Sequence, residues 1–341
     1  PPPPPPHFFF TQTTAYELGV RLVGSEMCIR DRLNQKHEPH YLSRSNLGMY
    51  YFDKNRKYLR LGPEGGGSFG SHEFQFIFTR KDYEAHPEWF AYFTLPDSQA
   101  RTLMKGTHPE HGKMREELKR GQRRGRWHWD YGNGWQICTS NPGTIKHAVA
   151  YAREYFAKHP DITIVSMGHN DTSGWCECDL CSKFAATANP PYTVSERYWH
   201  WVNQVAKELG KTHPDKRIAT LAYGAPAVPP RFELEKNISV MVTVYLEGHL
   251  DLTRRWKKKT NSVSLYSYAY GNSFVGFRHY PRAMRDFLKW GHDELGAIAH
   301  VSEVGGNWSF DGPKYRYMQE LMWNVNADTE EIMRNYCRDW F

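Results

Sequence analysis

A series of short β-branched runs separated by amphipathic helical patterns constrains the fold of this chain more than any other feature. The runs fall at residues 162–165, 217–223, 237–246, 262–270 and 296–303. Each has the length and apolar content of a buried strand. Strands that alternate with helices favour a parallel sheet, because a helix usually connects one parallel strand to the next. The sequence therefore predicts an α/β protein.

Helical periodicity is clearest between Ser195, the expected N-cap, and Gly210, the expected end of the helix. Its apolar face is formed by Tyr198, Trp201, Val202, Val205 and Leu209. Further elements are expected as helices at 144–156 (with Thr144 as N-cap), 281–290, 313–323 and 328–341, and as strands at 72–78 and 135–138.

Two architectures fit this alternation, an open doubly wound sheet and a closed (β/α)8 barrel. No glycine-rich phosphate loop follows any strand, which weakens the case for a nucleotide-binding sheet. Several predicted strands instead end in polar or aromatic residues, namely Asn170, Asp171, Tyr223, Glu247, Tyr268, Tyr270 and Glu303. A barrel brings many strand ends together on one face. We therefore expect a (β/α)8 TIM-like barrel, incomplete if the chain is a fragment.

The most informative strand end lies in the segment DITIVSMGHNDTSGWCECDLC, residues 161–181. Its apolar run stops at an imidazole, an amide and a carboxylate (His169, Asn170 and Asp171), and Trp175 follows closely. Ligands of α/β proteins bind at the carboxyl ends of strands. The segment therefore predicts a polar-ligand site with an aromatic wall, and the aromatic content of 15% is compatible with rings that stack on sugars.

Cleavage of a glycosidic bond requires a carboxyl group that stays protonated as general acid, and a second group opposite it. Burial beside aromatic surface suits the first role, because it disfavours the charged form. Glu303 ends one predicted strand and precedes a loop that reaches Trp308, and Asp171 ends another. We predict Glu303 as the general acid/base and Asp171 as the second carboxylate, with exchangeable roles.

The 2-acetamido group of an amino sugar can itself be the nucleophile, and the second carboxylate then orients that group. The expected sugar contacts are Asn170, Trp175, Tyr268, Tyr270 and Trp308. Structural alternatives remain open. Glu303 also suits a surface ion pair, Asp171 a turn, and the tyrosines a core. Glu247 is a rival for either catalytic role, and His169 is expected to be a hydrogen-bonded structural histidine.

Three cysteines, Cys176, Cys178 and Cys181, form a C-x-C-x-x-C cluster. Such a cluster supplies three of the four ligands of a structural zinc site, and His169 is the nearest candidate for the fourth. A disulfide and free buried thiols are the alternatives, the disulfide being favoured in an exported protein. The metal therefore stays open, and catalysis is expected to need no cofactor. Cys138 and Cys337 lie in apolar contexts and are expected in the core.

The net charge of +7 is concentrated between Lys105 and Arg126. Such a run usually forms a solvated surface loop or helix. A zinc-stabilised nucleic-acid binder is the less favoured hypothesis. Trp127 and Trp129 follow the basic residues without alternating with them, as the rings of a base-stacking surface would. No apolar run approaches the ~20 residues that cross a bilayer. We expect a glycan partner, no nucleic-acid partner and no membrane span, and the oligomeric state stays open.

Residues 1–32 are set aside from fold reasoning. PPPPPPHFFF is of low complexity, and AYELGVRLVGSEMCIRDR resembles translated sequencing-adapter read-through. Cys28 accordingly leaves the cysteine count. We expect an artefactual or disordered segment over 1–32 and one glycosidase domain over 33–341, truncated at its C-terminus.

Five motifs follow, in order, the pattern of the family called domain of unknown function 4838. They are HEFQFIFTRKDYEAHPEWFAYF, WQICTSNPG, HNDTSGWCECDLC, ERYWHWVNQVAKEL and LMWNVNADTEEIMRNYC. The resemblance covers roughly residues 71–341, and the basic run at 105–126 is interpreted as a loop insertion. The family resembles TIM-barrel glycoside hydrolases. Part of it is grouped as glycoside hydrolase family 163, with endo-β-N-acetylglucosaminidase activity on N-glycans.

The resemblance implies a glycoside hydrolase acting on amino-sugar-containing glycans, by substrate-assisted retaining hydrolysis like that of an endo-β-N-acetylglucosaminidase. It also implies a secreted or periplasmic protein. The alternative from a different functional class is a non-catalytic carbohydrate-binding barrel. The exact glycan, its linkage and the choice between endo and exo cleavage stay open.

Overall fold

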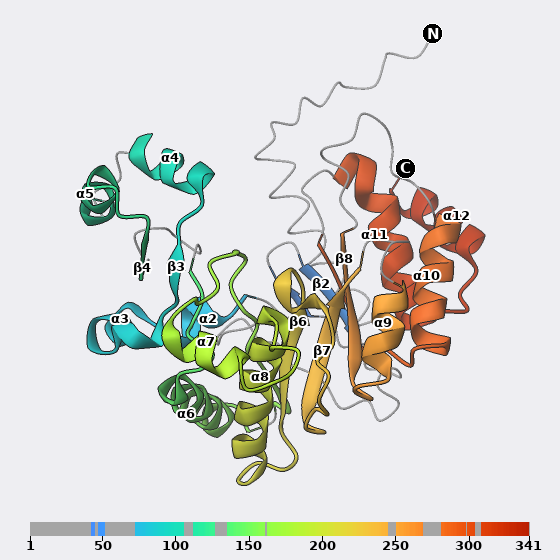
Figure 1. Cartoon of the computed structure of the whole chain (residues 1–341). Coiled ribbons are helices and arrows are strands. Elements are labelled where there is room, and N and C mark those ends of the chain that lie inside the picture. The colour runs from blue at the N-terminus through green and yellow to red at the C-terminus, as the bar shows by residue number, and fades with distance from the viewer. Residues whose placement is uncertain are drawn as a thin grey trace.

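The structure of the chain is a computed structural model. It describes residues 42–44, 47–51, 72–105, 112–126, 135–160, 162–244, 250–268, 281–297, 299–303 and 308–340. The segment 1–32 that the sequence set aside lies outside the described residues. A twisted sheet runs through the middle of the molecule, helices pack against it, and a small lobe projects at one side (Figure 1).

The main sheet has the strand order β1-β2-β9-β8-β7-β6-β5. Its five strands from β5 to β9 run parallel to one another. They are β5 Ile164–Ser166, β6 Arg217–Ala222, β7 Ile238–Thr243, β8 Val263–Tyr268 and β9 Ala299–Glu303. Each coincides with a predicted run, so the predicted α/β class is confirmed. All residues of β5 and β7 are buried, as expected for parallel strands covered on both faces.

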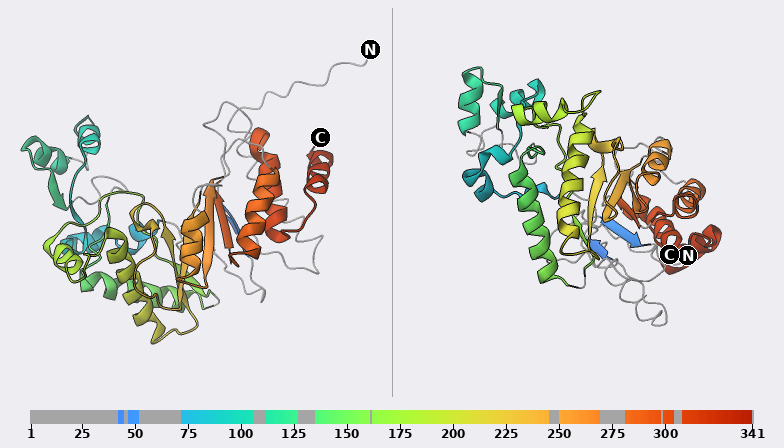
Figure 2. Two further views of the ribbon diagram at one scale, coloured as in Figure 1. Left: turned by 45° about the vertical axis from the view of Figure 1, so that its right-hand side comes forward. Right: turned by 60° about the horizontal axis from the view of Figure 1, so that its bottom comes forward.

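The expectation of a (β/α)8 barrel is wrong. Beyond β9 the sheet continues with β2 (Leu47–Tyr51) and β1 (Leu42–Arg44), and both pairings are antiparallel. Closure into such a barrel needs eight parallel strands, with the first bonded to the last. In the described part of the chain, β1 and β5 are instead the two opposite edges. The five parallel strands curl into half of a barrel, and the antiparallel hairpin occupies the side of β9 (Figure 2).

Helices fill the connections between the parallel strands. They are α6 Pro142–Lys158, α7 Asp179–Ala185, α8 Val194–Gly210, α9 Leu250–Lys257, α10 Pro281–Asp293, α11 Trp308–Trp323 and α12 Thr329–Trp340. Helices α6 and α8 pack on each other, as do α10, α11 and α12. None of the helices in the described ranges combines the length and hydrophobicity that a bilayer span requires.

The predicted face of α8 is confirmed, since its five apolar residues are all fully buried. The helix ends at Gly210 as expected, but its N-cap is Thr193 and not Ser195. The Thr193 hydroxyl accepts a hydrogen bond from the Glu196 backbone N–H at 3.2 Å, and the Glu196 carboxylate accepts one from the Thr193 N–H at 2.9 Å. This reciprocal capping box outcompetes a cap at Ser195, whose hydroxyl donates to the Val228 carbonyl.

The predicted strand at 72–78 is wrong. Only His72 makes a β-bridge, to Gly168, and Phe74–Ile77 forms the short helix α2. The sequence HEFQFIF has an apolar residue at every second position, yet Phe74, Ile77 and Phe78 also fit a helical face. Helical packing prevails here because the rings of Phe74 and Phe78 lie edge to face at 5.6 Å, while Phe76 stays 57% exposed.

Two neighbouring predictions also need correction. In place of a strand over 135–138, the structure has a single bridge between Ile137 and Phe90. Asn141, not Thr144, caps α6, since its Oδ1 accepts a hydrogen bond from the Gly143 N–H at 2.8 Å. Pro142 fits the next position because the first helical N–H needs no partner. Thr144 is buried instead.

The projecting lobe contains the basic run. It consists of β3 (Tyr92–Thr94), α4 (Asp97–Lys105), α5 (Gly112–Lys119) and β4 (Arg124–Arg126). Strands β3 and β4 pair antiparallel, so the chain leaves and returns at one point. We call residues 92–126 the basic lobe. It rises beside the body of the protein in both views (Figures 1 and 2). The helices α3 (Arg80–Ala85) and η1 (Pro87–Trp89) precede it in the chain.

Candidate functional site

The carboxyl ends of the parallel strands lie along one edge of the sheet, and two predicted site residues are neighbours there. Tyr268 and Glu303 are the last residues of β8 and β9, and the strand register pairs them directly. The Tyr268 side chain is half-buried and lies edge to face with Tyr266 at 5.6 Å. For Glu303 the structure describes the backbone only. The β-register therefore pairs the backbone positions of two residues of the predicted site.

Asn170 forms hydrogen bonds to other chain segments at this edge. It is fully buried. Its Nδ2 donates to the Trp135 carbonyl at 2.9 Å, and its Oδ1 accepts a hydrogen bond from the Gln75 backbone N–H at 3.2 Å. Gln136 adds hydrogen bonds to the backbone of Asn170 in both directions. The amide predicted to contact sugar thus ties three chain segments together from beneath the surface.

Asp171 and Trp175 lie nearer to solvent. Asp171 is exposed. Trp175 is half-buried, and its ring centroid lies 5.3 Å from His169 and 5.7 Å from Tyr198. The Tyr198 ring is fully buried and belongs to α8. One part of the Trp175 ring therefore packs on the core, while the remainder is accessible to solvent.

His169 has the environment of a structural histidine. It is 2% exposed, and its Nδ1 lies 3.0 Å from the carbonyl of Asn170. Because a carbonyl oxygen only accepts, Nδ1 carries the proton. Burial lowers the pKa of His169 to about 4. The ring is therefore neutral at pH 7, and it stacks on the ring of Tyr223 at 6.2 Å with an angle of 6° between the planes.

His72 is a candidate site residue that sequence reasoning did not single out. Its bridge to Gly168 places it at the carboxyl end of β5, and its ring lies 6.0 Å from both His169 and Tyr223. Its Nδ1 donates to the His169 carbonyl at 2.6 Å, which leaves Nε2 as the other ring nitrogen. A half-buried imidazole with one nitrogen fixed in this way can exchange a proton or a hydrogen bond with a ligand.

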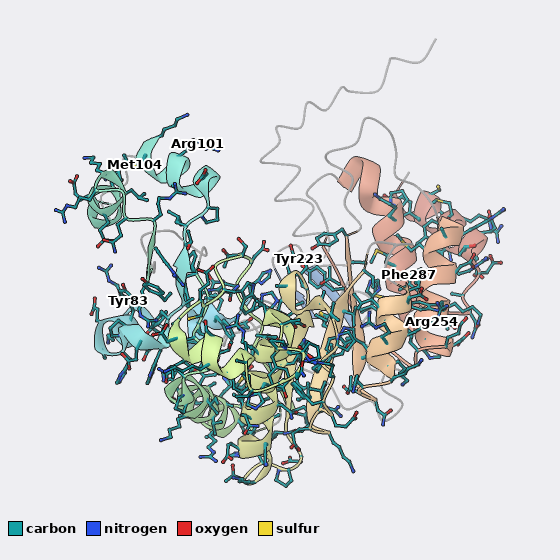
Figure 3. All side chains as sticks on the ribbon, in the orientation of Figure 1. Tyr83, Arg101, Met104, Tyr223, Arg254 and Phe287 are labelled. Carbon is teal, nitrogen blue, oxygen red and sulfur yellow. The ribbon has the colours of Figure 1, made fainter. Side chains whose placement is uncertain are left out.

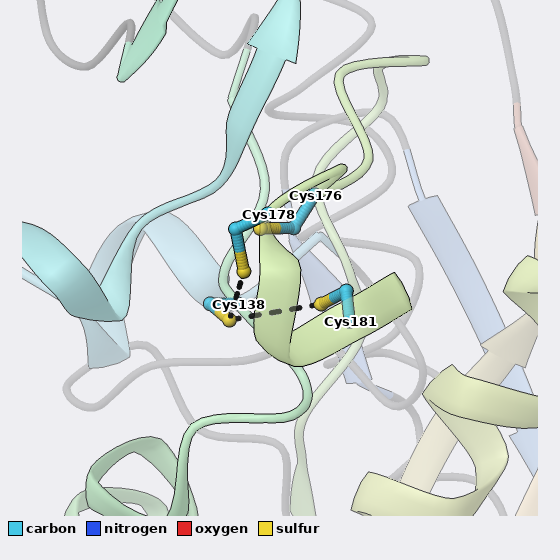
Figure 4. A group of neighbouring side chains, drawn as sticks. All are labelled: Cys138, Cys176, Cys178 and Cys181. Carbon is cyan, nitrogen blue, oxygen red and sulfur yellow. Dashed lines mark hydrogen bonds between the residues drawn. The ribbon is translucent and has the colours of Figure 1, made fainter. Parts of the chain in front are cut away.

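A four-cysteine cluster lies between this edge and the basic lobe (Figure 4). The Sγ atoms of Cys138, Cys176, Cys178 and Cys181 all lie within 4.8 Å of one another. Cys138 is 3.6 Å from Cys178 and 3.7 Å from Cys181. A disulfide needs about 2.05 Å. Tetrahedral zinc with Zn–S bonds of 2.3 Å separates its sulfurs by about 3.8 Å, which these distances approach.

The surroundings of the cluster favour the thiolate form at Cys178 and Cys181. Hydrogen bonds from the neighbouring cysteines raise the pKa of the Cys138 thiol, and the pKa of the Cys176 thiol is raised as well. Hydrogen bonds from Cys138 lower the pKa of the Cys181 and Cys178 thiols. The backbone N–H of Tyr92 donates to the Cys176 sulfur at 3.3 Å, and the Arg197 guanidinium donates to the Cys176 carbonyl at 3.0 Å. The donor set is soft and three of its four members are buried. Zinc fits such a set best among the common divalent ions of proteins.

The fourth ligand predicted from the sequence is wrong, because Cys138 and not His169 completes the cluster. Cys138 is also fully buried, so its expected place in the core is confirmed. The signal lay in the WQICTSNPG motif, where Cys138 follows an apolar run. Recognising it required the bridge between Phe90 and Ile137, which aligns that run beside the lobe. Cys337, also expected in the core, is exposed on α12.

The remaining predicted residues are only partly placed. Trp308 is the first residue of α11, and the structure gives its backbone position alone. Tyr270 and Glu247 lie outside the described residues. The predicted pair of Glu303 and Asp171 is thus placed by strand position, with β9 and β5 as the two outer members of the parallel set.

Comparison with known families identifies one match. Residues 23–341 match the model of the family described as domain of unknown function (DUF4838). The resemblance that the motifs predicted is therefore confirmed, and it extends over nearly the whole chain. No curated protein and no solved structure matches the chain.

Proposed function

The chain belongs to the DUF4838 family, and we propose that it is a glycoside hydrolase acting on amino-sugar-containing glycans. The observation that carries the proposal is the shared edge formed by the carboxyl ends of β5 to β9. The edge presents the carboxylate of Asp171 from one side and places Glu303 beside Tyr268 on the other. Such an edge is where parallel α/β proteins bind ligands.

Each residue has a chemical role in this proposal. Glu303 donates a proton to the leaving glycosidic oxygen and later takes one from the attacking water. The 2-acetamido oxygen of the substrate attacks the anomeric carbon, while Asp171 orients and polarises the acetamido N–H. Trp175 contacts the apolar face of a sugar ring. The half-buried phenol of Tyr268 offers a hydrogen bond next to the acid.

The curl of the sheet shortens the distance between the two outer strands of the parallel set. Five strands make four steps, so β5 and β9 lie about 19 Å apart measured along the sheet. Curling the sheet into half a cylinder shortens the straight path between their backbones to about 12 Å. The two outer strands of the curled sheet are thus nearer to each other than those of a flat sheet would be.

The test measures hydrolysis of an aryl 2-acetamido-2-deoxy-β-glucoside and of a chitobiose-core N-glycan. We expect Glu303→Gln and Asp171→Asn each to lower kcat by about 100-fold or more, as loss of a general acid or of an orienting carboxylate does. The matched control is Asp215→Asn. Asp215 is 73% exposed and precedes β6 at the opposite, amino edge. The Asp215→Asn substitution removes one carboxylate at a position away from the proposed site.

Substrate assistance has its own signature, since an aryl glucoside with a 2-hydroxyl group lacks the internal nucleophile. The wild type should therefore leave that compound uncleaved. Wild-type rates in both Glu303→Gln and Asp171→Asn would remove the catalytic assignment. Glycan affinity without turnover on any substrate would replace the hydrolase with a carbohydrate-binding protein.

The four-cysteine cluster is proposed as a structural zinc site. Three observations support it: the tetrahedral-like sulfur spacing, the burial of three thiols, and the hydrogen bond from the Tyr92 N–H to Cys176. Bound zinc would join the loop after β5 to the segment before α6 that carries Cys138, and the lobe would contact the site through the Tyr92 N–H. It would act by fixing these segments, and the hydrolysis itself is routed through carboxylates.

Metal analysis of the purified protein tests this site. We expect one zinc per chain, and its loss in Cys181→Ser, whose sulfur is fully buried in the cluster. Cys337→Ser is the matched control, since Cys337 is exposed and lies on α12. A wild-type protein that holds no metal, and whose four clustered cysteines are found as disulfides by mass spectrometry, would contradict the assignment.

A further inference from the structure

The basic lobe holds a large share of the positive charge of the chain. Residues 97–126 contain nine lysines and arginines and four acidic residues, a net charge of +5 out of +7 for the whole protein. Two of the acids are already neutralised by partners inside the lobe, Asp97 by Arg123 at 2.5 Å and Glu116 by Lys119 at 2.7 Å. The lobe therefore presents uncompensated cations that neither the sheet edge nor the cysteine cluster uses.

A cavity of about 380 Å³ opens in this lobe. Its lining combines three apolar side chains, three cations and one carboxylate, namely Ala100, Met104, Leu118, Arg101, Lys105, Arg123 and Asp97. Ala100 and Leu118 are buried, whereas Met104 is 42% exposed. The volume is at the small end of ligand pockets and suits a single sugar residue.

Arg101 and Lys105 are the two lining cations that we consider for binding a ligand. They are four residues apart on α4, so they lie on one face of the helix, and both are exposed. Within the described residues, neither makes a hydrogen bond or an ion pair. Arg123 differs, because it is held by Asp97 and by the Leu95 carbonyl. Arg101 also interacts electrostatically with the Asp97 carboxylate, one turn earlier on the helix. Three cations against one carboxylate still leave the lining positively charged, and this charge next to an apolar surface is complementary to a carboxylate on a partly apolar molecule.

The lobe stands on the side of the proposed catalytic edge. Tyr223, which directly follows β6, marks the carboxyl end of the sheet, and Arg101 and Met104 lie beyond it on the same side (Figure 3). The base of the lobe is fixed to the loop that follows Trp175. The Glu177 N–H donates to the Tyr92 carbonyl at 2.7 Å, and Arg124 donates to the Glu177 carbonyl at 3.0 Å.

A nucleic acid fits the lobe less well than a sugar. Sequence-independent binding of single strands uses exposed aromatic rings as stacking surfaces. Among the described residues of the lobe, the aromatic side chains are Tyr92 and Phe93. Phe93 is buried, and the Tyr92 ring is flanked by Arg124 and Arg126 at 5.2 and 5.8 Å. The pocket therefore suits one compact anionic group, and its described residues provide no ring on which a nucleic-acid base could stack.

We propose that the pocket of the basic lobe is a binding subsite for a carboxylated sugar, such as the acidic terminal residue of a branched glycan. Arg101 and Lys105 bind the carboxylate, and Met104, Ala100 and Leu118 contact the apolar part of the sugar, such as an acetyl methyl group. The inference rests on the proposed function insofar as the rest of that glycan reaches the catalytic edge. The subsite would make acidic glycans the preferred substrates.

Titration calorimetry of the wild-type protein with N-acetylneuraminic acid and with its methyl ester tests the subsite directly. We expect binding of the acid in the millimolar range, at least tenfold weaker binding of the ester, and at least tenfold weaker binding of the acid by Arg101→Ala/Lys105→Ala. The control is Lys146→Ala/Lys207→Ala, which removes the same charge from exposed positions on α6 and α8. Its affinity for the acid should equal that of the wild type.

Equal affinity of the wild type and Arg101→Ala/Lys105→Ala for the acid would overturn the proposal. So would displacement of the acid by a short DNA strand at physiological salt, which would assign the lobe to nucleic acid. Hydrolysis gives an independent readout, since the double variant should lower the ratio of kcat/KM for sialylated over neutral N-glycans. Residue-dependent binding without any hydrolysis would keep the subsite and reject the hydrolase. Hydrolysis with an unchanged ratio of kcat/KM would keep the hydrolase and reject the subsite.

Discussion

Two buried histidines make the stability of this protein sensitive to mild acid. His169 lies at the carboxyl end of β5, and His300 lies in β9 with its Nε2 at 2.7 Å from the Ser267 hydroxyl. Both are 2% exposed. Burial lowers the pKa of His169 to about 4 and that of His300 to about 3, from an ordinary value of 6.5. Both rings are therefore neutral in the native state at pH 5, whereas they are protonated in the unfolded chain.

The sign and size of the effect follow from linkage between protonation and folding. A group whose pKa is lower in the folded state stabilises the protein fully above pH 6.5, and this contribution is lost as the pH falls toward the folded-state pKa. Between pH 7 and pH 5 the loss is about 2 kcal/mol for each histidine. The figure is insensitive to the folded-state pKa, because both values lie below 5 and the unfolded chain takes up nearly all the protons.

Urea unfolding of the wild type and of His300→Gln at pH 7 and pH 5 measures this contribution. Glutamine keeps a hydrogen-bonding group for Ser267 but does not titrate. We expect the unfolding free energy of His300→Gln to fall by about 2 kcal/mol less than that of the wild type between the two pH values. Comparing the change with pH, rather than the stability at one pH, cancels any packing defect of the variant. An equal fall in both proteins would refute the reasoning.

Three further variants probe other parts of the structure. In Gly143→Ala the new Cβ would lie 2.3 Å from the Trp89 Nε1, so we expect thermal unfolding to show a loss of about 1–3 kcal/mol. Arg231→Met leaves the 6% exposed carboxylate of Glu196 without its cation, and chemical unfolding should show a loss of about 2 kcal/mol. His72→Asn keeps a donor for its carbonyl partner but removes Nε2, so kcat/KM on a glycan should fall about tenfold.

Each of these variants has a matched control. Gly210→Ala places its Cβ 3.5 Å from the nearest atom and should not be destabilised. Arg80→Met breaks an ion pair in which both side chains are more than half exposed, and should change stability by less than about 0.5 kcal/mol. His292→Asn removes an exposed imidazole from α10 and should leave turnover unchanged. A control that behaves like its test variant would contradict the corresponding explanation.

The sequence predicted the parallel strands well because their signal is local. Runs such as ISVMVT in β7 hold three consecutive apolar residues and no charged one, and all six positions are buried, as expected for a strand covered on both faces. The barrel prediction failed because closure depends on which strand pairs with β9. That partner is Leu47–Tyr51, in a part of the sequence with little apolar patterning. The HEFQFIF segment failed for a different reason, since its apolar residues fit both periods and packing decided between them.

The candidate site was predictable to the same extent. The sequence predicted Asp171 and Glu303 as strand-end carboxylates. Glu303 does end β9, whereas Asp171 lies five residues beyond the end of β5. The sequence could not show that both polar atoms of Asn170 bind other backbone segments, because those partners lie 34 or more residues away along the chain. The sequence did not show Cys138 as a member of the cluster for the same reason, since Cys138 and Cys181 are 43 residues apart in the chain.

Cys138 is far in sequence from the other clustered cysteines, so the reactivity of these thiols can report on the progress of folding. Their sulfurs converge only after α6 and β5, which lie between Cys138 and Cys176 in the chain, have reached their places. Pulse alkylation during refolding would therefore mark chains in which this half of the molecule is still open. Exposed Cys337 would react at every stage and so supply the internal reference.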